Sequence, residues 1–475
     1  MRAVLSLLLA ALATGAVAQP LPPQVKAVLT RAHVPLSAVA AVVRPVDEGP
    51  AVVSHNAEPA MNFASVMKLV TSFAALDILG PAFTFRTDVL VNGEITAGVL
   101  QGDLVLRGGG DPKLTYERLW QVAHQLRARG LREIRGDVVI DRGYFTTTAH
   151  DPGQFDNEPR RAYNVGADAF LVNFQVVDFT FIPAGTGVRV TGDPDLPNVE
   201  LASNVSLASG ACGAWRRNLR HDVHVNGLIT TVVFSGSYPA DCGERHWPLA
   251  VLDGPRMTEA TLRWVWSEAG GVLRGRVRNG ATPTDAKLFY RHDSEPLANL
   301  VRDMNKHSNN VVARHLFLAL SAERAAPGTA AASAGIVTDW LRQRAIDATG
   351  LVIENGSGLS RDERASAGTI AALLRAAWAS PVMPELASSL PIFAVDGTLK
   401  SRRPDSAAGY AHLKGGTLTD VQSIAGYVLD RRGRRWVVVM AINHPAAGAA
   451  QPALDALVEW VHREAGAVRA RRGSP

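Results

Sequence analysis

The sequence predicts an α/β fold in which one domain, with a sheet that joins strands from both ends of the chain, is divided by a long β-rich insertion. Three observations predict it: strand patterns near both ends, helical periodicity after Ser294, and many short glycine-punctuated β runs between residues 87 and 286. With 475 residues, 47% of them hydrophobic and 20% charged, the chain is not disordered, collagenous or of low complexity.

The first part of the chain contains two short strands and one helix. Residues 37–54 alternate around a Pro-Val-Asp-Glu-Gly-Pro turn, which predicts the strand pair. Apolar residues at positions 66, 69, 70, 73, 76 and 79 then form a helical stripe, and Gly80-Pro81 predicts its end.

The insertion is predicted to contain one amphipathic helix, near Tyr116 to Ala128, among its strands. After it the helical pattern returns in residues 295–323, 332–345 and 365–378. Two strands, 422–430 and 435–443, are joined by an Arg-Arg-Gly-Arg hairpin turn, and a helix over Pro452–Arg463 closes the fold.

The first residues and the two cysteines bear on whether the protein is exported. Residues 1–18 have the layout of a secretory signal peptide, and no stretch is long enough for a stable transmembrane span. Cys212 and Cys242 form either one disulfide, worth about 3 kcal/mol, or two separate buried thiols. No metal-binding motif is present, and no basic-aromatic motif supports nucleic-acid binding.

Ser65-Val66-Met67-Lys68 is the S-x-x-K tetrapeptide of the chain. On a helix, positions i and i+3 share a face, so the lysine amine can approach the serine oxygen. An apolar pocket with further cations lowers the pKa of a lysine, which makes it a base near neutral pH. Only seven of the 49 basic residues are lysines, so this spacing is informative. The alternative is a solvated helix residue.

Two further motifs follow in the chain. Ser308-Asn309-Asn310 can turn a hydroxyl and an amide into one cleft from a helix end, although a helix cap is the alternative. Lys414-Gly415-Gly416-Thr417 precedes the final strand pair, and its glycines allow an extended ligand to approach the backbone, although a simple turn is the alternative.

In the order S-x-x-K, S-x-N, K-x-G, the three motifs resemble those of penicillin-binding proteins and serine β-lactamases. Their flanks resemble the class C penicillin-binding proteins, the D-alanyl-D-alanine carboxypeptidase/endopeptidase family: residues 304–310, 355–361, 395–399, 414–428 and Gly108-Gly109-Gly110-Asp111-Pro112. The resemblance implies an α+β, penicillin-binding/β-lactamase-like transpeptidase domain, with an antiparallel sheet and helices on both faces. The sequence patterns described above place the boundaries at 1–18 for the signal peptide, 19–86 and 287–475 for the catalytic domain, and 87–286 for the insertion.

By the same resemblance, Ser65 is the acylated nucleophile and Lys68 its general base. Ser308 and Lys414 relay protons to the leaving D-alanine amine, and Asn310 holds the substrate amide. These assignments match what acyl transfer needs, namely an activated nucleophile and a proton donor for a poor leaving group.

Substrate contacts are expected from Gly416, Thr417 and Arg361. The backbone N–H groups of Ser65 and Thr417 would form the oxyanion hole, and Arg361 matches a family arginine that reads substrate carboxylates, although a surface role is the alternative. The resemblance implies no cofactor and no metal, a periplasmic enzyme, peptidoglycan as substrate and β-lactams as inhibitors. The resemblance does not decide whether the protein forms a homodimer.

One position departs from the family pattern, because Gly415 replaces the usual threonine or serine after the motif lysine. The missing hydroxyl would weaken carboxylate binding by about 1–2 kcal/mol unless Thr417, two positions on, compensates. The alternative hypothesis is therefore a peptidoglycan-binding scaffold with weakened catalysis.

Overall fold

The computed structural model describes residues 20–146 and 150–467. The predicted signal peptide, residues 1–18, lies outside the described residues. Among the residues described, no helix combines the length and the apolar character needed to cross a membrane.

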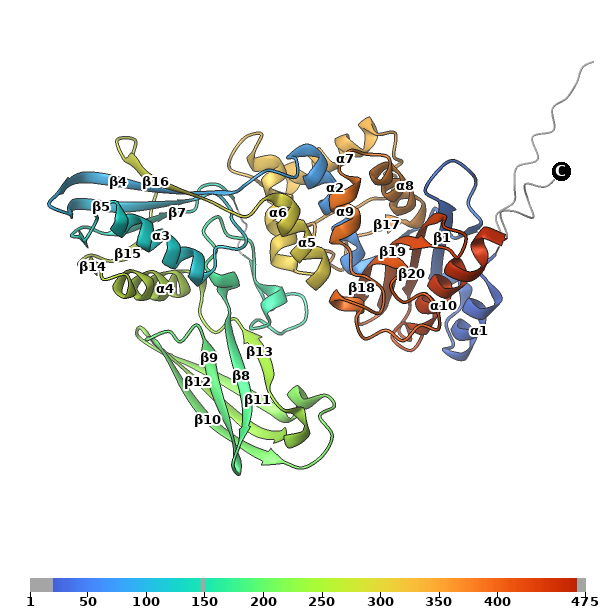
Figure 1. The fold of residues 1–475 in the computed structure, drawn as a ribbon, viewed down its shortest axis with the longest axis horizontal. Coiled ribbons are helices and arrows are strands. Elements are labelled where there is room, and N and C mark those ends of the chain that lie inside the picture. The colour runs from blue at the N-terminus through green and yellow to red at the C-terminus, as the bar shows by residue number, and fades with distance from the viewer. Residues whose placement is uncertain (1–19, 147–149, 468–475) are drawn as a thin grey trace, which may run out of the picture.

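The α/β domain is built on one antiparallel sheet that joins the two ends of the chain (Figure 1). Its five strands occur in the order β18 (Ala411–Leu418), β19 (Val421–Leu429), β20 (Arg435–Asn443), β1 (Val39–Pro45) and β2 (Val53–His55). Alternate residues of the central strands pack into different layers: Ile424 and Val428 face one core, and Ala425 and Tyr427 face the other. This two-sided burial explains why these strands are almost wholly apolar.

Helices cover both faces of this sheet, which confirms the predicted arrangement. One face packs against α1 (Pro23–Arg31) and α10 (Pro452–Trp460). The other packs against α2 (Lys68–Ile78), α5 (Leu297–His307), α6 (Asn310–Ala322), α7 (Ala330–Gln343), α8 (Ala367–Trp378) and α9 (Met383–Ser389). A small two-stranded sheet, β3 (Ala60–Met61) with β17 (Ala365–Ser366), lies beside them.

The helical pattern of residues 295–323 is divided into two helices at Ser308. This residue has the left-handed conformation, with φ of 56°, and ends α5. The side chain of Asn309 then accepts a hydrogen bond from the Val312 N–H and caps α6. Ser308 and Asn310 consequently lie at an interhelical turn.

The first part of the insertion, formed by its first and last segments in the sequence, is a seven-stranded sheet with two helices. Its strands are β4 (Arg86–Thr96), β5 (Val99–Gly108), β6 (Glu133–Ile134), β7 (Val138–Asp141), β14 (Val272–Leu273), β15 (Val277–Asn279) and β16 (Lys287–Asp293). β16 pairs with β4, so residues 287–293, expected in the catalytic domain, lie in the sheet of the insertion. Besides α3 (Tyr116–Ala128), found where it was predicted, there is a second helix, α4 (Gly254–Glu268), which was not expected.

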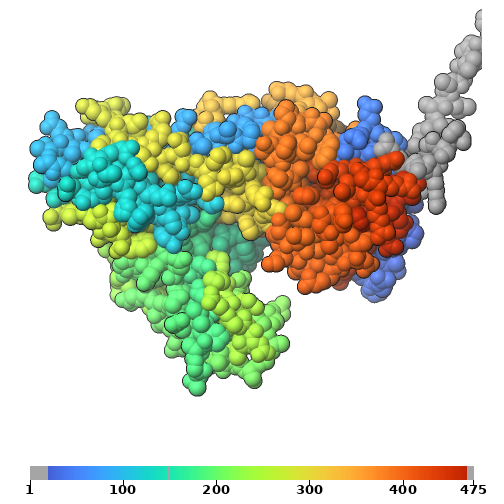
Figure 2. Space-filling view, viewed as in Figure 1, coloured from blue at the N-terminus to red at the C-terminus, as the bar shows by residue number. Residues whose placement is uncertain are grey.

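The second part of the insertion is a six-stranded lobe that projects from the rest of the molecule (Figures 1 and 2). Its strands are β8 (Val177–Ala184), β9 (Gly187–Asp193), β10 (Val199–Ala208), β11 (Leu219–Asn226), β12 (Ile229–Pro239) and β13 (Arg245–Leu249). Cys212 and Cys242 form a disulfide in this lobe, which resolves the two alternatives that the sequence left open.

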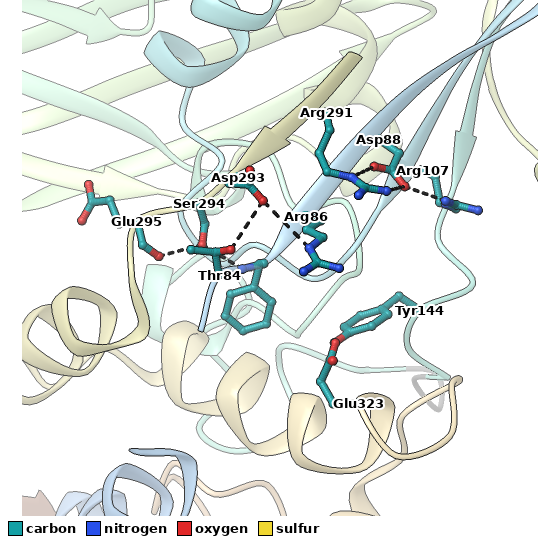
Figure 3. Close-up of polar contacts among 11 residues, drawn as sticks. Thr84, Arg86, Asp88, Arg107, Tyr144, Arg291, Asp293, Ser294, Glu295 and Glu323 are labelled. Atoms are coloured by element: carbon teal, nitrogen blue, oxygen red, sulfur yellow. Dashed lines mark hydrogen bonds and ion pairs between the residues drawn. The ribbon is translucent and has the colours of Figure 1, made fainter. Parts of the chain in front are cut away.

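The chain enters and leaves the insertion through adjacent segments (Figure 3). The Ser294 N–H donates to the carbonyl of Phe85 at 2.9 Å, and the Phe85 N–H donates to Ser294 Oγ at 3.0 Å. On the neighbouring sheet surface, Arg291 and Arg107 both bind the carboxylate of Asp88 across adjacent strands. The two hydrogen bonds between Phe85 and Ser294 hold the connecting segments together beside α5 and α6, which carry part of the candidate site.

Candidate active site

Ser65 lies in the first turn of a helix that begins as a 3-10 turn, Ala64–Met67, and continues as α2. Ala64 has φ of 47°, and its N–H donates to Asn62 Oδ1 at 2.8 Å. Asn62 in turn exchanges two hydrogen bonds with Asn443 at the end of β20, at 2.9 and 2.8 Å. The serine is therefore held at the positive end of a helix and tied to the central sheet.

Lys68 points back at Ser65 from the next turn. Its Nζ donates to Ser65 Oγ at 3.0 Å, to Asn310 Oδ1 at 2.7 Å and to the Ser357 carbonyl at 2.5 Å. The side chain is fully buried, which is not the solvated lysine of the alternative interpretation.

The surroundings of Lys68 favour its neutral form. Burial holds the pKa of Lys68 well below its usual range, and the positive charges of Lys414 and Arg314 lower it further, while Glu363 acts in the opposite direction. A buried amine with a lowered pKa, 3.0 Å from a serine hydroxyl, is placed to accept its proton.

Lys414 and Ser308 form a second amine–hydroxyl pair. Lys414 Nζ donates to Ser308 Oγ and to the Gly415 carbonyl, both at 2.8 Å. Burial lowers the pKa of Lys414 to about 7. The pair can thus give or take a proton near neutral pH.

β18 lies against the start of the Ser65 helix because Gly416 has no side chain. A Cβ at Gly416 would lie 2.5 Å from the Phe63 carbonyl oxygen and 3.0 Å from the Ser65 backbone nitrogen. Only glycine allows this approach of the two backbones. The next residue, Thr417, is exposed, and its hydroxyl donates to Gln422 Oε1 at 3.3 Å.

Gly415 is under no such constraint. A Cβ at this position would have one close neighbour, Leu399 Cδ2, at 3.4 Å. Steric crowding therefore does not explain why glycine stands here in place of threonine or serine.

Arg361 lies on the rim of a neighbouring cavity of about 590 Å³. Its guanidinium lies 4.5 Å from the ring centroid of Phe155, a residue of the insertion, and pairs with Asp420 at 3.3 Å. Both members of this ion pair are more than half exposed, so it adds little stability. Among the described residues, the polar partner of Arg361 is Asp420 and not a motif residue, so its substrate role stays a prediction.

The structure adds contacts to the site that the motifs did not indicate. Asn310 Nδ2 donates to the carbonyl of Tyr163 at 3.1 Å, so the insertion also contributes to the site. The carbonyl of Ser357 and the carboxylate of Glu363 come from the segment after α7. Tyr163 and Ser357 contribute their backbone carbonyls, which leave no signature in the sequence. Over residues 20–146 and 150–467, no group of three or more potential ligands could hold a metal ion.

The sequence matches the D-Ala-D-Ala carboxypeptidase 3 (S13) family over residues 21–464. It is 31% identical over 423 residues to a D-alanyl-D-alanine carboxypeptidase of Actinomadura sp. (strain R39), a match that covers 85% of this chain and 78% of that protein. The chain belongs to the D-Ala-D-Ala carboxypeptidase 3 (S13) family. A second member, D-alanyl-D-alanine carboxypeptidase DacB of Haemophilus influenzae, is 26% identical over 426 residues, which cover 87% of this chain and 86% of that protein.

Solved structures of penicillin binding protein 4 have the same fold as this S13 chain. Penicillin binding protein 4 from Haemophilus influenzae matches with a TM-score of 0.75 at 23% identity, over 92% of this chain and 99% of that one. The same protein in complex with a β-lactam matches with a TM-score of 0.73 at 22% identity, over 93% and 99%. The penicillin-binding/β-lactamase-like fold class is confirmed. As an S13 family member, the chain is a serine-type carboxypeptidase, a hydrolase.

Proposed function

We propose that this chain is a D-alanyl-D-alanine carboxypeptidase/endopeptidase that cleaves peptidoglycan stem peptides and cross-links through an acyl-enzyme on Ser65. The observation that carries the proposal is the buried Lys68 amine at 3.0 Å from Ser65 Oγ, in a chain of the S13 family. The nucleophile and its base have the contact that covalent catalysis requires.

Acylation would begin when neutral Lys68 takes the proton of Ser65 and the Oγ attacks the carbonyl carbon of the D-alanyl-D-alanine bond. Ser308 then gives its proton to the leaving amine and takes one from the Lys414 ammonium, as the C–N bond breaks. The pKa of Lys414, about 7, suits this donor role. Water afterwards attacks the ester, a proton of the water goes to Lys414, and Lys68 returns one to Ser65.

Substrate would lie along β18, where Gly416 leaves the backbone accessible. Asn310 would hold the substrate amide, and the backbone N–H groups of Ser65 and Thr417 would stabilise the oxyanion, each worth about 3–4 kcal/mol. The cation of Lys414 suits the terminal carboxylate of a stem peptide. Arg361 would read a carboxylate farther along the peptide.

The same attack on a β-lactam carbonyl would leave a stable acyl-enzyme, so we infer that β-lactams inhibit the protein. Related structures support this: one penicillin binding protein 4 structure is complexed with a β-lactam, and a predatory peptidoglycan endopeptidase of Bdellovibrio bacteriovorus is acylated by penicillin G. Because peptidoglycan lies outside the inner membrane, the proposal includes export to the periplasm by residues 1–18.

Labelling with a fluorescent penicillin tests the proposal. We expect covalent labelling of the wild-type protein and none of Ser65→Ala, which removes the acylated oxygen. Digestion of purified peptidoglycan should release D-alanine and split cross-linked peptides, again only with wild type. An unlabelled wild-type protein, under conditions that label a known relative, would favour the weakened scaffold suggested by Gly415.

A further inference from the structure

A buried carboxylate, that of Glu363, lies behind the proposed active site. Its side chain is inaccessible to solvent. Four backbone N–H groups of one loop donate to it: those of Glu354, Asn355 and Gly356 to Oε1 at 3.0, 2.8 and 2.9 Å, and that of Gly358 to Oε2 at 2.8 Å. We call residues 354–358 the carboxylate loop. Its conformation depends on one side chain that accepts all four bonds.

The carboxylate loop contacts the reacting groups directly. The carbonyl of Ser357 accepts a hydrogen bond from Lys68 Nζ at 2.5 Å, and that of Gly356 accepts one from Thr71 Oγ1 at 2.6 Å. A Cβ at Gly358 would lie 1.9 Å from the Ala64 carbonyl oxygen and 2.9 Å from the Ser65 nitrogen. A displacement of the loop backbone at Ser357 or Gly358 must therefore move Lys68 or the start of the Ser65 helix.

Glu363 also balances the charge around Lys68. Three buried basic side chains lie together here: Lys68 on α2, Arg314 on α6 and Lys414 on β18. Burial raises the pKa of Glu363 itself, and its four backbone N–H bonds oppose that shift by stabilising the carboxylate. As a carboxylate, Glu363 raises the pKa of Lys68 against the effects of burial, Lys414 and Arg314. The charge of Glu354, which is exposed on the same loop, raises the pKa of Arg314 instead.

We propose that Glu363 is a positioning residue for the acyl transfer: it holds the carboxylate loop so that the Ser357 carbonyl keeps the Lys68 amine against Ser65, and it supplies the negative charge that this amine faces. The inference rests on the proposed function. Glu363 itself touches neither the nucleophile nor the base, and it acts through the loop backbone and through its field.

The test compares the pH dependence of acylation by fluorescent penicillin in the wild type, Glu363→Gln and Glu354→Gln. In Glu363→Gln the amide cannot accept all four N–H bonds, so we expect acylation to slow about tenfold to a hundredfold. Loss of the negative charge lowers the pKa of Lys68, so the acidic limb of the profile should move to lower pH. Glu354→Gln makes the same chemical change at an exposed position of the same loop and should leave rate and limb unchanged.

Each outcome decides the proposal. If folded Glu363→Gln, judged by its thermal unfolding, keeps the wild-type rate, or slows with an unmoved limb, the proposal is overturned while the proposed function stands. If Glu363→Gln does not fold, Glu363→Asp replaces it, because it keeps the charge but withdraws the carboxylate by one methylene. We then expect slower acylation with the limb unmoved, and a wild-type rate overturns the proposal. A wild type that is not labelled overturns the proposed function together with this inference.

Discussion

Two consecutive glycines on β18 show how strongly single residues constrain the proposed site. In Gly416→Ala the new methyl group would meet the backbone of Phe63 and Ser65, which must move apart. A displacement of about 1 Å can cost about a hundredfold in rate, so we expect acylation by fluorescent penicillin to fall by that order. The matched control is Gly415→Ala, whose methyl group has one ordinary contact, with Leu399. Equal acylation rates in the two variants would contradict the prediction.

The residues that the motifs indicated meet in space, whereas their supporting contacts were not foreseeable. Two motif spacings, S-x-x-K and S-x-N, and the scarcity of lysine predicted that five side chains meet in one site. They are Ser65, Lys68, Ser308, Asn310 and Lys414. Support from the carbonyls of Ser357 and Tyr163 could not be predicted, because any residue has a carbonyl and only the tertiary fold aims it. The buried Glu363 resembles an ordinary surface charge in the sequence, because it lies in the charged run Arg361-Asp362-Glu363-Arg364.

At the scale of elements, the long periodic segments were predicted well, whereas one helix of the insertion and one domain boundary were not. α4 was not predicted from the sequence, although Pro255 occupies its first turn, where proline is favoured. Asp253 caps this helix by accepting a hydrogen bond from the Arg256 N–H. The boundary at residue 287 depended on strand pairing between β16 and β4, which sequence periodicity does not report.

The disulfide of the six-stranded lobe gives a prediction at this scale. Cys212 and Cys242 are 30 residues apart, and closing such a loop is worth about 3–4 kcal/mol in the chain-entropy model. Reducing agent, or Cys212→Ser combined with Cys242→Ser, should lower the thermal unfolding temperature. Because the insertion and the α/β domain have separate apolar cores, Ser65 labelling below that temperature should persist. Identical unfolding curves with and without reductant would refute this.

At the scale of the whole molecule, the insertion is joined to the α/β domain at several places besides its two connections. His315 on α6 is fully buried, and its Nδ1 donates to the Gly110 carbonyl at 2.9 Å while its Nε2 accepts from the Asp168 N–H at 3.3 Å. Nearby, the backbone of Thr146 donates to the Gly328 carbonyl at 3.0 Å. Both partners of His315 belong to the insertion, so a neutral imidazole with one defined tautomer connects the two parts.

This histidine should make the junction sensitive to acid. Burial lowers the pKa of His315 to about 4, from about 6.5 in an unfolded chain. Between these values the unfolded chain binds more protons than the folded one, so stability falls as the pH drops from 6.5 to 4, by up to about 3 kcal/mol. Protonated Nε2 would also face the Asp168 N–H, donor against donor. His315→Asn keeps the donor to Gly110 but cannot titrate. Its unfolding midpoint should therefore vary less with pH than that of wild type.

The comparison of variants isolates this effect from other titrating groups. Burial raises the pKa of Asp111 to about 6, which acts in the opposite direction, stabilising the fold as the pH falls from 6 toward 4. Asp111 is present in both proteins, so its contribution cancels in their difference. His224→Asn, at an exposed position on β11, is the matched control and should follow the wild-type curve. If the His315→Asn curve also runs parallel to wild type between pH 6.5 and 4, then His315 does not carry the acid sensitivity of the junction.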